Sequence, residues 1–166
     1  MPTIRPITPR DDAAVATLVR ASLASFGVSG PGSPATDVEL DGMAAAYRGP
    51  AAQFFVIDRD GEVVGCGGFG PLQGTSPEHA IAEIRKVHIH PEIRGAGHGR
   101  ALVTLLLERM QAAGYHTAYL ETMPEMTTAQ HLYRRLGFRE HARLGSTGHS
   151  CCAIPFARSL SATADS

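Results

Sequence analysis

The chain has 166 residues, and its 15 Lys+Arg against 16 Asp+Glu give a formal net charge of −1. Its length predicts one domain, and 43% hydrophobic with 19% charged residues is too apolar for a disordered chain. The near-zero charge argues against a nucleic-acid partner, and no apolar run approaches the roughly 18 residues that cross a bilayer. Three cysteines without a signal-peptide pattern predict a cytoplasmic protein rather than a disulfide framework.

The beginning of the chain predicts one strand and two helices. We expect the strand at residues 3–8 and the first helix at 11–26. Its apolar stripe consists of Ala14, Val15, Leu18, Val19 and Leu23. Residues 27–36 are rich in glycine, proline and serine, which predicts a mobile loop, placed like a lid over a substrate. Helical spacing resumes at residues 37–47.

The middle of the chain predicts three strands. Residues 53–58 and 62–69 form a β-hairpin with Asp60 and Gly61 at its tip. Glycines inside its second strand mark a bulge or the close approach of another backbone; they are Gly65, Gly67 and Gly68. A third strand at 80–90 places charged and apolar side chains on one face, which indicates a cleft; they are Ile81, Glu83, Arg85, Val87 and Ile89.

The last part of the chain alternates helix and strand. Helices are expected at 99–113, ended by Gly114, and at 127–136. Apolar side chains of the first recur at helical spacing; they are Leu102, Val103, Leu106, Leu107 and Met110. Strands are expected at 117–122, 138–143 and 149–157. The order predicts a mixed α/β (α+β) domain at residues 1–158 with helices on both faces of a sheet, followed by a disordered tail at 159–166.

The segment 94–100 joins a strand to the helix at 99–113 through glycines at alternate positions, Gly95, Gly97 and Gly99. Such a segment exposes backbone N–H groups at a helix N-terminus and predicts a cradle for a phosphate or pyrophosphate. An ordinary flexible turn is the alternative. The chain lacks the lysine of an ATP-binding P-loop. A dinucleotide site, with Glu121 on the ribose, remains a minor alternative because Arg100 replaces its third glycine.

These residues resemble a known family. Arg94-x-x-Gly97-x-Gly99 is similar to the [RQ]-x-x-G-x-[GA] loop of the GNAT (GCN5-related) N-acetyltransferases. The strand A-E-I-R-K-V-H-I-H-P, the L-E-T strand at 120–122 and A-Q-H-L-Y-R-R-L-G-F at 129–138 follow in the order and spacing of that family. The resemblance covers nearly the whole chain. It implies a mostly antiparallel sheet of six or seven strands flanked by about four helices.

The resemblance also implies acetyl-CoA as co-substrate. Its pyrophosphate would be bound by the loop residues Arg94, Gly95, Ala96, Gly97, His98, Gly99 and Arg100. A strand splayed from its neighbour would offer backbone groups to the pantetheine and thioester; its residues are Val87, His88 and Ile89. Met126 stands where the family often has a pantetheine-binding asparagine, so Thr127 or Thr128 would supply that contact.

Three residues are implied for catalysis. Tyr133 would protonate the departing thiolate, and its alternative role is that of a core aromatic. Glu83 and Glu121 compete as the base that deprotonates the amine. We favour Glu83, although it could instead form a salt bridge with Arg85 or Lys86.

The acceptor is expected to be the primary amine of a small molecule, a free amino acid among them. Arg85 would then bind the substrate carboxylate, unless it forms a salt bridge instead. His88 and His149 would form the pocket wall, and no metal is expected because the histidine spacing fits no zinc motif. Acetylation of protein N-termini or lysines is one alternative function, and a non-catalytic acyl-CoA-binding module is another. The oligomeric state, a homodimer included, stays open.

Overall fold

The computed structural model describes residues 1–148 and 153–160. Within these residues seven strands form one sheet in the order β1-β2-β3-β4-β5-β7-β6. Only β4 and β5 run parallel, and the other neighbours are antiparallel. The mixed, mostly antiparallel sheet is therefore confirmed. Its strands are β1 Thr3–Pro6, β2 Gln53–Arg59, β3 Glu62–Pro71, β4 Ile81–Ile89, β5 Thr117–Thr122, β6 Arg139–Glu140 and β7 Ile154–Ser159.

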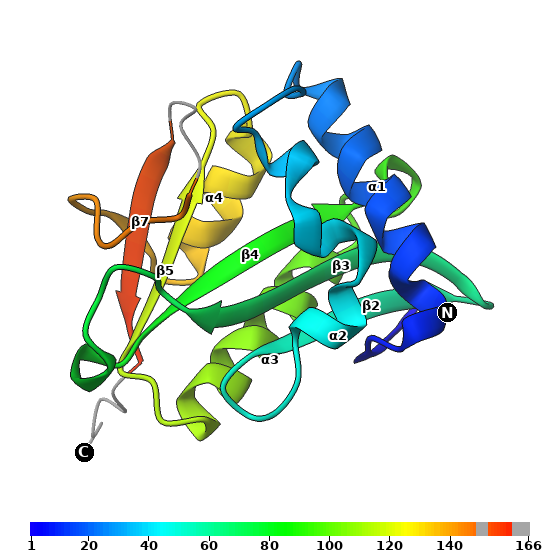
Figure 1. The fold of residues 1–166 in the computed structure, drawn as a ribbon. Coiled ribbons are helices and arrows are strands. Elements are labelled where there is room, and N and C mark those ends of the chain that lie inside the picture. The colour runs from blue at the N-terminus through cyan, green and yellow to red at the C-terminus, as the bar shows by residue number, and fades with distance from the viewer. Residues whose placement is uncertain (149–152, 161–166) are drawn as a thin grey trace.

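Helices cover both faces of this sheet, as expected (Figure 1). The α-helices in the described part of the chain are α1 Asp12–Ser25, α2 Met43–Ala46, α3 His98–Ala112 and α4 Thr127–Arg135. Side chains of α1 and α2 form one buried cluster with Phe54 and Val56 of β2, whereas α3 and α4 pack with Phe55 and Ile57 on the opposite face. The alternation along β2 follows from the two-residue period of a strand.

The N-terminal helices differ in detail from the prediction. Ala16, not Ala14, completes the buried stripe of α1. The helix expected at 37–47 is instead a 3₁₀ turn, η3 (Val38–Asp41), followed by the short α2, because the backbone of Gly42 (φ −157°, ψ 51°) is not helical. The predicted loop before it contains a second 3₁₀ turn, η2 (Pro34–Thr36).

The hairpin and its glycines agree with the prediction. Asp60 and Gly61 both have positive φ angles, 53° and 87°, as the twist of a tight hairpin requires. A Cβ on Gly68 would lie 2.4 Å from Cδ2 of Phe54, and one on Gly67 would lie 2.9 Å from Cγ2 of Val87. The absent side chains therefore let β3 pack closely between its neighbours and the helices.

A bulge in β4 changes which of its side chains share a face. Lys86 has a φ of 54°, and the pairing of β3 with β4 shifts register beside it. Ala82 and Ile84 pack in the α3 cluster, and beyond the bulge it is Val87 and Ile89 that do so. The expectation that Val87 and Ile89 share the face of Glu83 is therefore wrong, because one extra residue inverts the alternation.

The parallel strands β4 and β5 separate after a short pairing. Their register runs from Ile81 opposite Thr117 to Glu83 opposite Tyr119 and stops there. β4 continues to Ile89 and β5 to Thr122, so the two strands diverge as a fork with Glu83 at its base (Figure 1). The splayed strand that the sequence could only suggest by resemblance is present.

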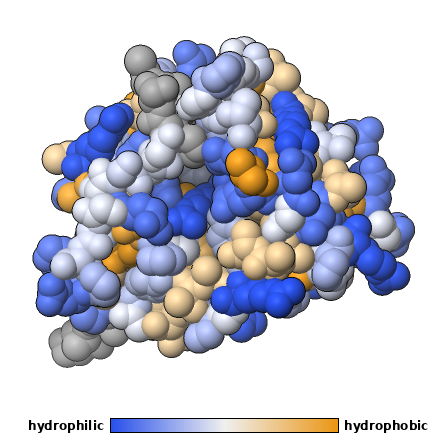
Figure 2. All heavy atoms as spheres, viewed as in Figure 1, coloured by the Kyte–Doolittle hydropathy of each residue, from blue (hydrophilic) through white to orange (hydrophobic). Residues whose placement is uncertain are grey.

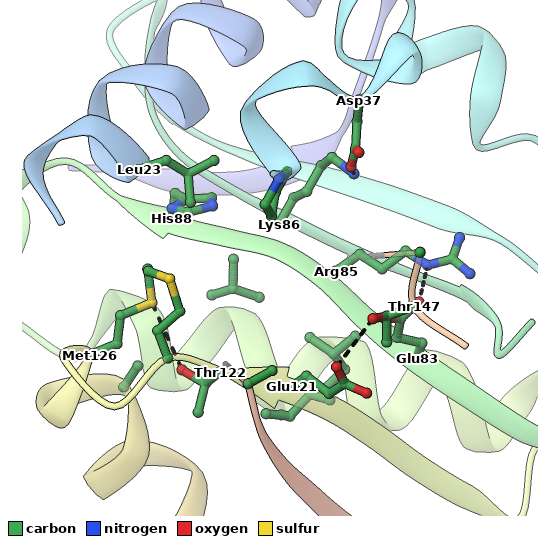
Figure 3. Close-up of a pocket in the computed structure, with 18 of the residues that line it drawn as sticks. Leu23, Asp37, Glu83, Arg85, Lys86, His88, Glu121, Thr122, Met126 and Thr147 are labelled. Atoms are coloured by element: carbon green, nitrogen blue, oxygen red, sulfur yellow. Dashed lines mark hydrogen bonds and ion pairs between the residues drawn. The ribbon is translucent and has the colours of Figure 1, made fainter. Parts of the chain in front are cut away.

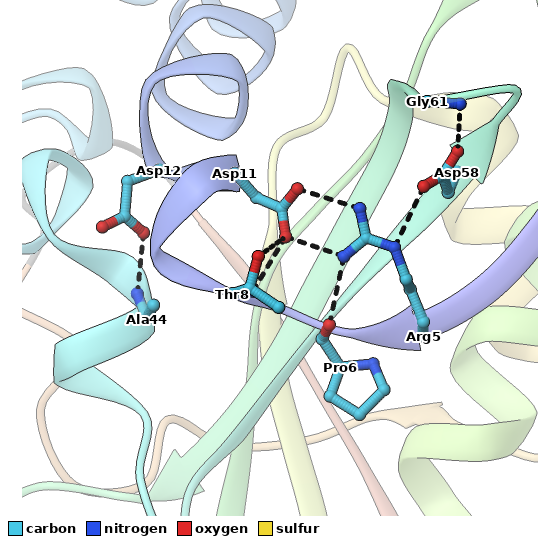
Figure 4. A network of polar contacts seen from close by, with 8 residues as sticks. All are labelled: Arg5, Pro6, Thr8, Asp11, Asp12, Ala44, Asp58 and Gly61. Atoms are coloured by element: carbon cyan, nitrogen blue, oxygen red, sulfur yellow. Dashed lines mark hydrogen bonds and ion pairs between the residues drawn. The ribbon is translucent and has the colours of Figure 1, made fainter.

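Arg5 connects β1, the start of α1 and the hairpin (Figure 4). Its two terminal nitrogens donate to the Asp11 carboxylate at 2.8 and 2.9 Å, and its Nε donates to Asp58 at 3.0 Å. Asp11 also accepts from the backbone N–H of Thr8, and Asp58 accepts from that of Gly61. These bonds place α1 against the sheet edge.

The domain extends past the predicted boundary at residue 158. β7 runs to Ser159, and Leu160 is buried and donates its N–H to His116 O at 2.8 Å. The prediction of a disordered tail from residue 159 is therefore wrong for Ser159 and Leu160, because Leu160 packs into the core. Residues 161–166 lie outside the described part. None of the described helices has the length and apolar character that crossing a membrane requires.

Candidate active site

A cavity of about 570 Å³ lies between α1 and the following 3₁₀ turns, the forked strands β4 and β5, and α4 (Figure 3). The surface is hollowed on the face shown in Figure 2, where hydrophilic residues prevail around the opening. Pro34 of the predicted lid lines this cavity. The volume is within the range of small-molecule sites.

The fold brings six of the predicted site residues to this cavity; they are Glu83, Arg85, Val87, His88, Glu121 and Tyr133. Ile89 packs instead against the α3 cluster. Thr128 is exposed and does not line the cavity, whereas Met126 does. His149 lies outside the described residues. The two candidate bases and the candidate acid thus share one cavity although they are far apart in sequence.

Glu83 is buried at the base of the fork and paired with a cation. Its Oε1 lies 2.7 Å from Nε of Arg85, so the predicted salt bridge is present. Nη2 of Arg85 donates to the Pro71 carbonyl at 2.7 Å, and the guanidinium packs over Gly70 of β3. Arg85 therefore fixes the Glu83 carboxylate, and two of its nitrogens are engaged within the protein.

Glu121 is held mainly by hydroxyl groups. Its Oε2 accepts from Tyr119 at 2.6 Å and its Oε1 accepts from Thr147 at 3.1 Å (Figure 3). Burial and the Glu121 hydrogen bond raise the pKa of Tyr119, which therefore stays a donor at neutral pH. Nε of Arg143 lies 3.9 Å away and is half exposed. The carboxylate is thus buried in the cavity wall with few nearby cations.

Tyr133 is 6% exposed, and its ring contacts Phe138 edge-on, 5.8 Å between centroids. Burial raises the pKa of its hydroxyl, so the group is protonated at neutral pH. Within residues 1–148 and 153–160, no group is hydrogen-bonded to this hydroxyl. A protonated hydroxyl in a cavity wall without such a partner is suited to donate to a bound molecule.

His88 lies across the cavity, on the α1 side of the β4 bulge. Its Nδ1 is 2.9 Å from Oγ of Ser22 in α1. Burial, with the nearby positive charges of Lys86 and Arg94, lowers the pKa of His88 to about 4. The imidazole is therefore neutral near pH 7 and adds no charge to the cavity.

Sequence reasoning missed the role of the segment around η3. The Lys86 ammonium, 6% exposed, is bound by Asp37 at 2.9 Å and by Glu39. Glu39 also accepts from the Tyr47 hydroxyl at 2.9 Å. These bonds attach the segment after the predicted lid to the β4 bulge. The only signal in the sequence was the pair of acidic residues directly after the glycine-rich loop.

The glycine segment forms the N-terminal end of α3. Gly95 and Gly97 have φ angles of 82° and 86°, and a Cβ at either would meet nothing within 4 Å. Arg94 is tied back by its Nε, which donates to the Ile89 carbonyl at 3.0 Å. The first N–H groups of a helix have no partner within it, and here that end is exposed. The local structure fits an anion.

The position of Arg100 differs from that of the catalytic candidates. Arg100 lines a second hollow of about 740 Å³ with Arg135 and Arg158, between α3 and the end of β7. It does not line the cavity that contains Glu83. No group of three or more His, Cys, Asp or Glu is arranged for a metal ion within residues 1–148 and 153–160.

The forked sheet, the glycine-rich start of α3 and the cavity at the fork together indicate an acetyltransferase. A model of the acetyltransferase (GNAT) family matches residues 18–138, and the chain belongs to this family.

Its relatives agree. The chain is 36% identical over 162 residues to the uncharacterized N-acetyltransferase YjgM of Escherichia coli, covering 96% of this chain and 95% of that protein. A GNAT-family acetyltransferase from Staphylococcus aureus has the same fold, with a TM-score of 0.82 at 18% identity over 96% of this chain and 99% of the other. The structure of yncA from Salmonella typhimurium with acetyl-CoA gives a TM-score of 0.76 at 22% identity, over 96% and 94% of the two chains.

Proposed function

We propose that the protein transfers the acetyl group of acetyl-CoA directly to the primary amine of a small molecule, using the cavity between β4 and β5. The observation that carries this proposal is the meeting of Glu83, Glu121 and Tyr133 in one cavity at the fork of the sheet. Direct transfer needs a base for the amine, a proton for the thiolate and donors for the thioester oxygen.

The donor would lie along the fork. The start of α3, with Gly95 and Gly97 in left-handed conformations, supplies unpaired N–H groups for the pyrophosphate. Past Glu83 no strand of the described chain pairs with β4 on its β5 side. Backbone groups of the segment that contains Val87 and His88 are thus available to the pantetheine, and one N–H would stabilise the thioester oxygen as charge develops on it.

Glu83 is the proposed base. It occupies the last paired position before the strands diverge, and Arg85 fixes its carboxylate there. An amine bound as ammonium loses a proton to this carboxylate before it attacks the thioester carbon. Glu121, two residues past the partner of Glu83 on β5, is the alternative base. Its two oxygens already accept hydrogen bonds from Tyr119 and Thr147.

Tyr133 is the proposed acid. Its protonated hydroxyl, raised in pKa by burial, lines the same cavity and can donate to the sulfur as the carbon–sulfur bond breaks. Attack of the amine on the thioester carbon gives a tetrahedral centre, which collapses to the amide and free CoA as the carbon–sulfur bond breaks and the nitrogen loses its second proton. A free phenolate would be unfavourable in this site, so the proton has to be replaced from solvent or from the acceptor ammonium after each turnover.

A small acceptor is supported by the size of the cavity, which is closed on one side by the segment from Pro34 to Glu39. The alternative of a free amino acid bound by Arg85 receives less support, since Arg85 already binds Glu83 and Pro71. Acetylation of a protein N-terminus or lysine uses the same chemistry. The assay described next distinguishes it from acetylation of a small molecule.

The test is a thiol-release assay with acetyl-CoA and a panel of amino acids, polyamines, aminoglycosides and N-terminal peptides. We expect saturable CoA release with a small amine. Activity on peptides alone would overturn the small-molecule acceptor, and tight acetyl-CoA binding without release over the whole panel would overturn the enzyme in favour of a binding module.

A further inference from the structure

The charge of the cavity wall bears on the chemical nature of the acceptor. The inference drawn from it rests on the proposed function. Among the described residues that line it, four are carboxylates, Asp37, Glu39, Glu83 and Glu121, and two are cations, Arg85 and Lys86. His88 is neutral near pH 7 because burial lowers its pKa to about 4. The described wall is therefore net negative.

Both cations are already engaged within the protein. Lys86, nearly fully buried, is bound by Asp37 and Glu39, and Arg85 is bound by Glu83 and the Pro71 carbonyl. Neither ammonium nor guanidinium is positioned to receive a carboxylate of the substrate without breaking an ion pair. A substrate carboxylate would instead meet like charges in a partly desolvated site, which is unfavourable.

The carboxylates lie at two depths. The side chains of Glu83 and Glu121 are 10% and 7% exposed, whereas those of Asp37 and Glu39 are 24% and 30% exposed and belong to the segment that borders the opening. Tyr133, 6% exposed, lines the same cavity, and within the described residues its hydroxyl has no hydrogen-bond partner, so it can donate to a ligand there. The acidic side chains of the wall thus form a more exposed pair, Asp37 and Glu39, and a more buried pair, Glu83 and Glu121.

From this arrangement we infer that the acceptor is a small aliphatic diamine or polyamine. Its reacting amine would lie between Glu83 and Tyr133, and a second ammonium group would lie beside Asp37 and Glu39. The cavity would select for the second positive charge and against a carboxylate at the same position, because opposite charges attract there and like charges repel.

The test uses three five-carbon amines that differ only in the group at the far end. Pentane-1,5-diamine carries an ammonium, pentylamine carries no charge, and 5-aminopentanoate carries a carboxylate. We expect kcat/KM for the diamine to exceed that of pentylamine by about tenfold and that of 5-aminopentanoate by about a hundredfold at low salt. Raising the ionic strength should shrink both ratios.

A matched pair of variants tests which side chains produce the preference for the diamine. Asp37→Asn should lower the ratio between the diamine and pentylamine several-fold, chiefly through KM. Asp41→Asn, at the end of the 3₁₀ turn that follows Asp37 but paired with Arg20 outside the cavity, should keep the wild-type ratio. Equal efficiency with all three amines, or a preference for 5-aminopentanoate, would overturn the inference while leaving acetyl transfer intact. Absence of CoA release with every amine would be failure of the proposed function itself.

Discussion

Carboxylates lie beside arginine side chains at the β1 edge of the sheet and again in the cavity wall, but their other partners differ. Around Arg5, Asp11 and Asp58 also accept hydrogen bonds from the backbone N–H groups of Thr8 and Gly61. In the cavity, Glu121 is held by the hydroxyls of Tyr119 and Thr147. Backbone donors make a carboxylate part of the fold, whereas hydroxyl donors leave it able to exchange partners and protons. We therefore expect the carboxylates around Arg5 to contribute chiefly to stability and those of the cavity to contribute chiefly to turnover.

The largest effect is expected at the proposed base. Glu83→Gln removes the proton acceptor but keeps the shape of the side chain, so kcat should fall about a thousandfold at an unchanged KM for acetyl-CoA. The measurement is steady-state CoA release. Glu62→Gln, an exposed carboxylate paired with Arg59, is the matched control and should turn over like wild type. Wild-type turnover in Glu83→Gln would remove Glu83 from this role and leave Glu121 as the candidate.

The next largest effect is a loss of stability in mild acid. It is expected from His88 in the cavity wall. The folded protein binds a proton on His88 only near its pKa of about 4, whereas the unfolded chain does so near 6.5, so the free energy of unfolding decreases as the pH falls between these values. The loss should reach about 3 kcal/mol.

Urea unfolding at a series of pH values measures this slope. It should flatten in His88→Gln and persist in His141→Gln, since His141 is exposed. A His88 resonance that titrates near its ordinary value would contradict the assignment.

A smaller effect is expected from the Arg5 cluster, at lower pH. Hydrogen bonding to Arg5, opposed in part by burial, lowers the pKa of Asp11 from 3.8 to about 2. Stability from this carboxylate is complete above pH 3.8 and is lost as the pH falls toward 2, with Asp11→Asn costing about 2 kcal/mol at pH 7. The exposed pair of Arg20 with Asp41 provides the control, because Asp41→Asn should change stability by less than about 0.5 kcal/mol. Asp11→Asn with normal stability but lost turnover would reverse the proposed division between the clusters.

The smallest effect is expected at Tyr133. Tyr133→Phe keeps the edge-on contact with Phe138 and removes only the hydroxyl, so kcat should fall about tenfold. Tyr115→Phe, whose hydroxyl donates to the Ala51 carbonyl outside the cavity, should leave kcat unchanged. If Tyr133→Phe instead destabilised the fold without changing kcat, Tyr133 would be a core aromatic.

The regular spacing of apolar side chains and the glycines at the ends of helices made most of the fold predictable. All five apolar side chains expected on the stripe of α3 are buried, and Gly114 and Gly137 have the positive φ that ends a helix. The face of β4 was not predictable, because its bulge puts Lys86 in a left-handed conformation that lysine does not signal. The end of the last strand was predicted too early, because a single buried residue, Leu160, follows polar neighbours.

The candidate site was predictable in its residues and not in its contacts. The resemblance to the acetyltransferase family pointed to Glu83, Glu121 and Tyr133, which do line one cavity. The clamp of Lys86 by Asp37 and Glu39 joins segments far apart in the chain, and such pairing depends on the bulge and on tertiary packing. The same holds for the place of Arg100, which lines the second hollow with Arg135 and Arg158.

One measurement tests the central claim that the cavity carboxylates and tyrosine carry out direct acetyl transfer. Wild type and Glu83→Gln are incubated with acetyl-CoA labelled in the acetyl carbonyl and with pentane-1,5-diamine, and free CoA and labelled amine are quantified by mass spectrometry over the same time course. We predict one labelled amide for each CoA released by wild type, no labelled protein, and almost no product from Glu83→Gln. Equal product from the two proteins, or label accumulating on the protein, would contradict the account.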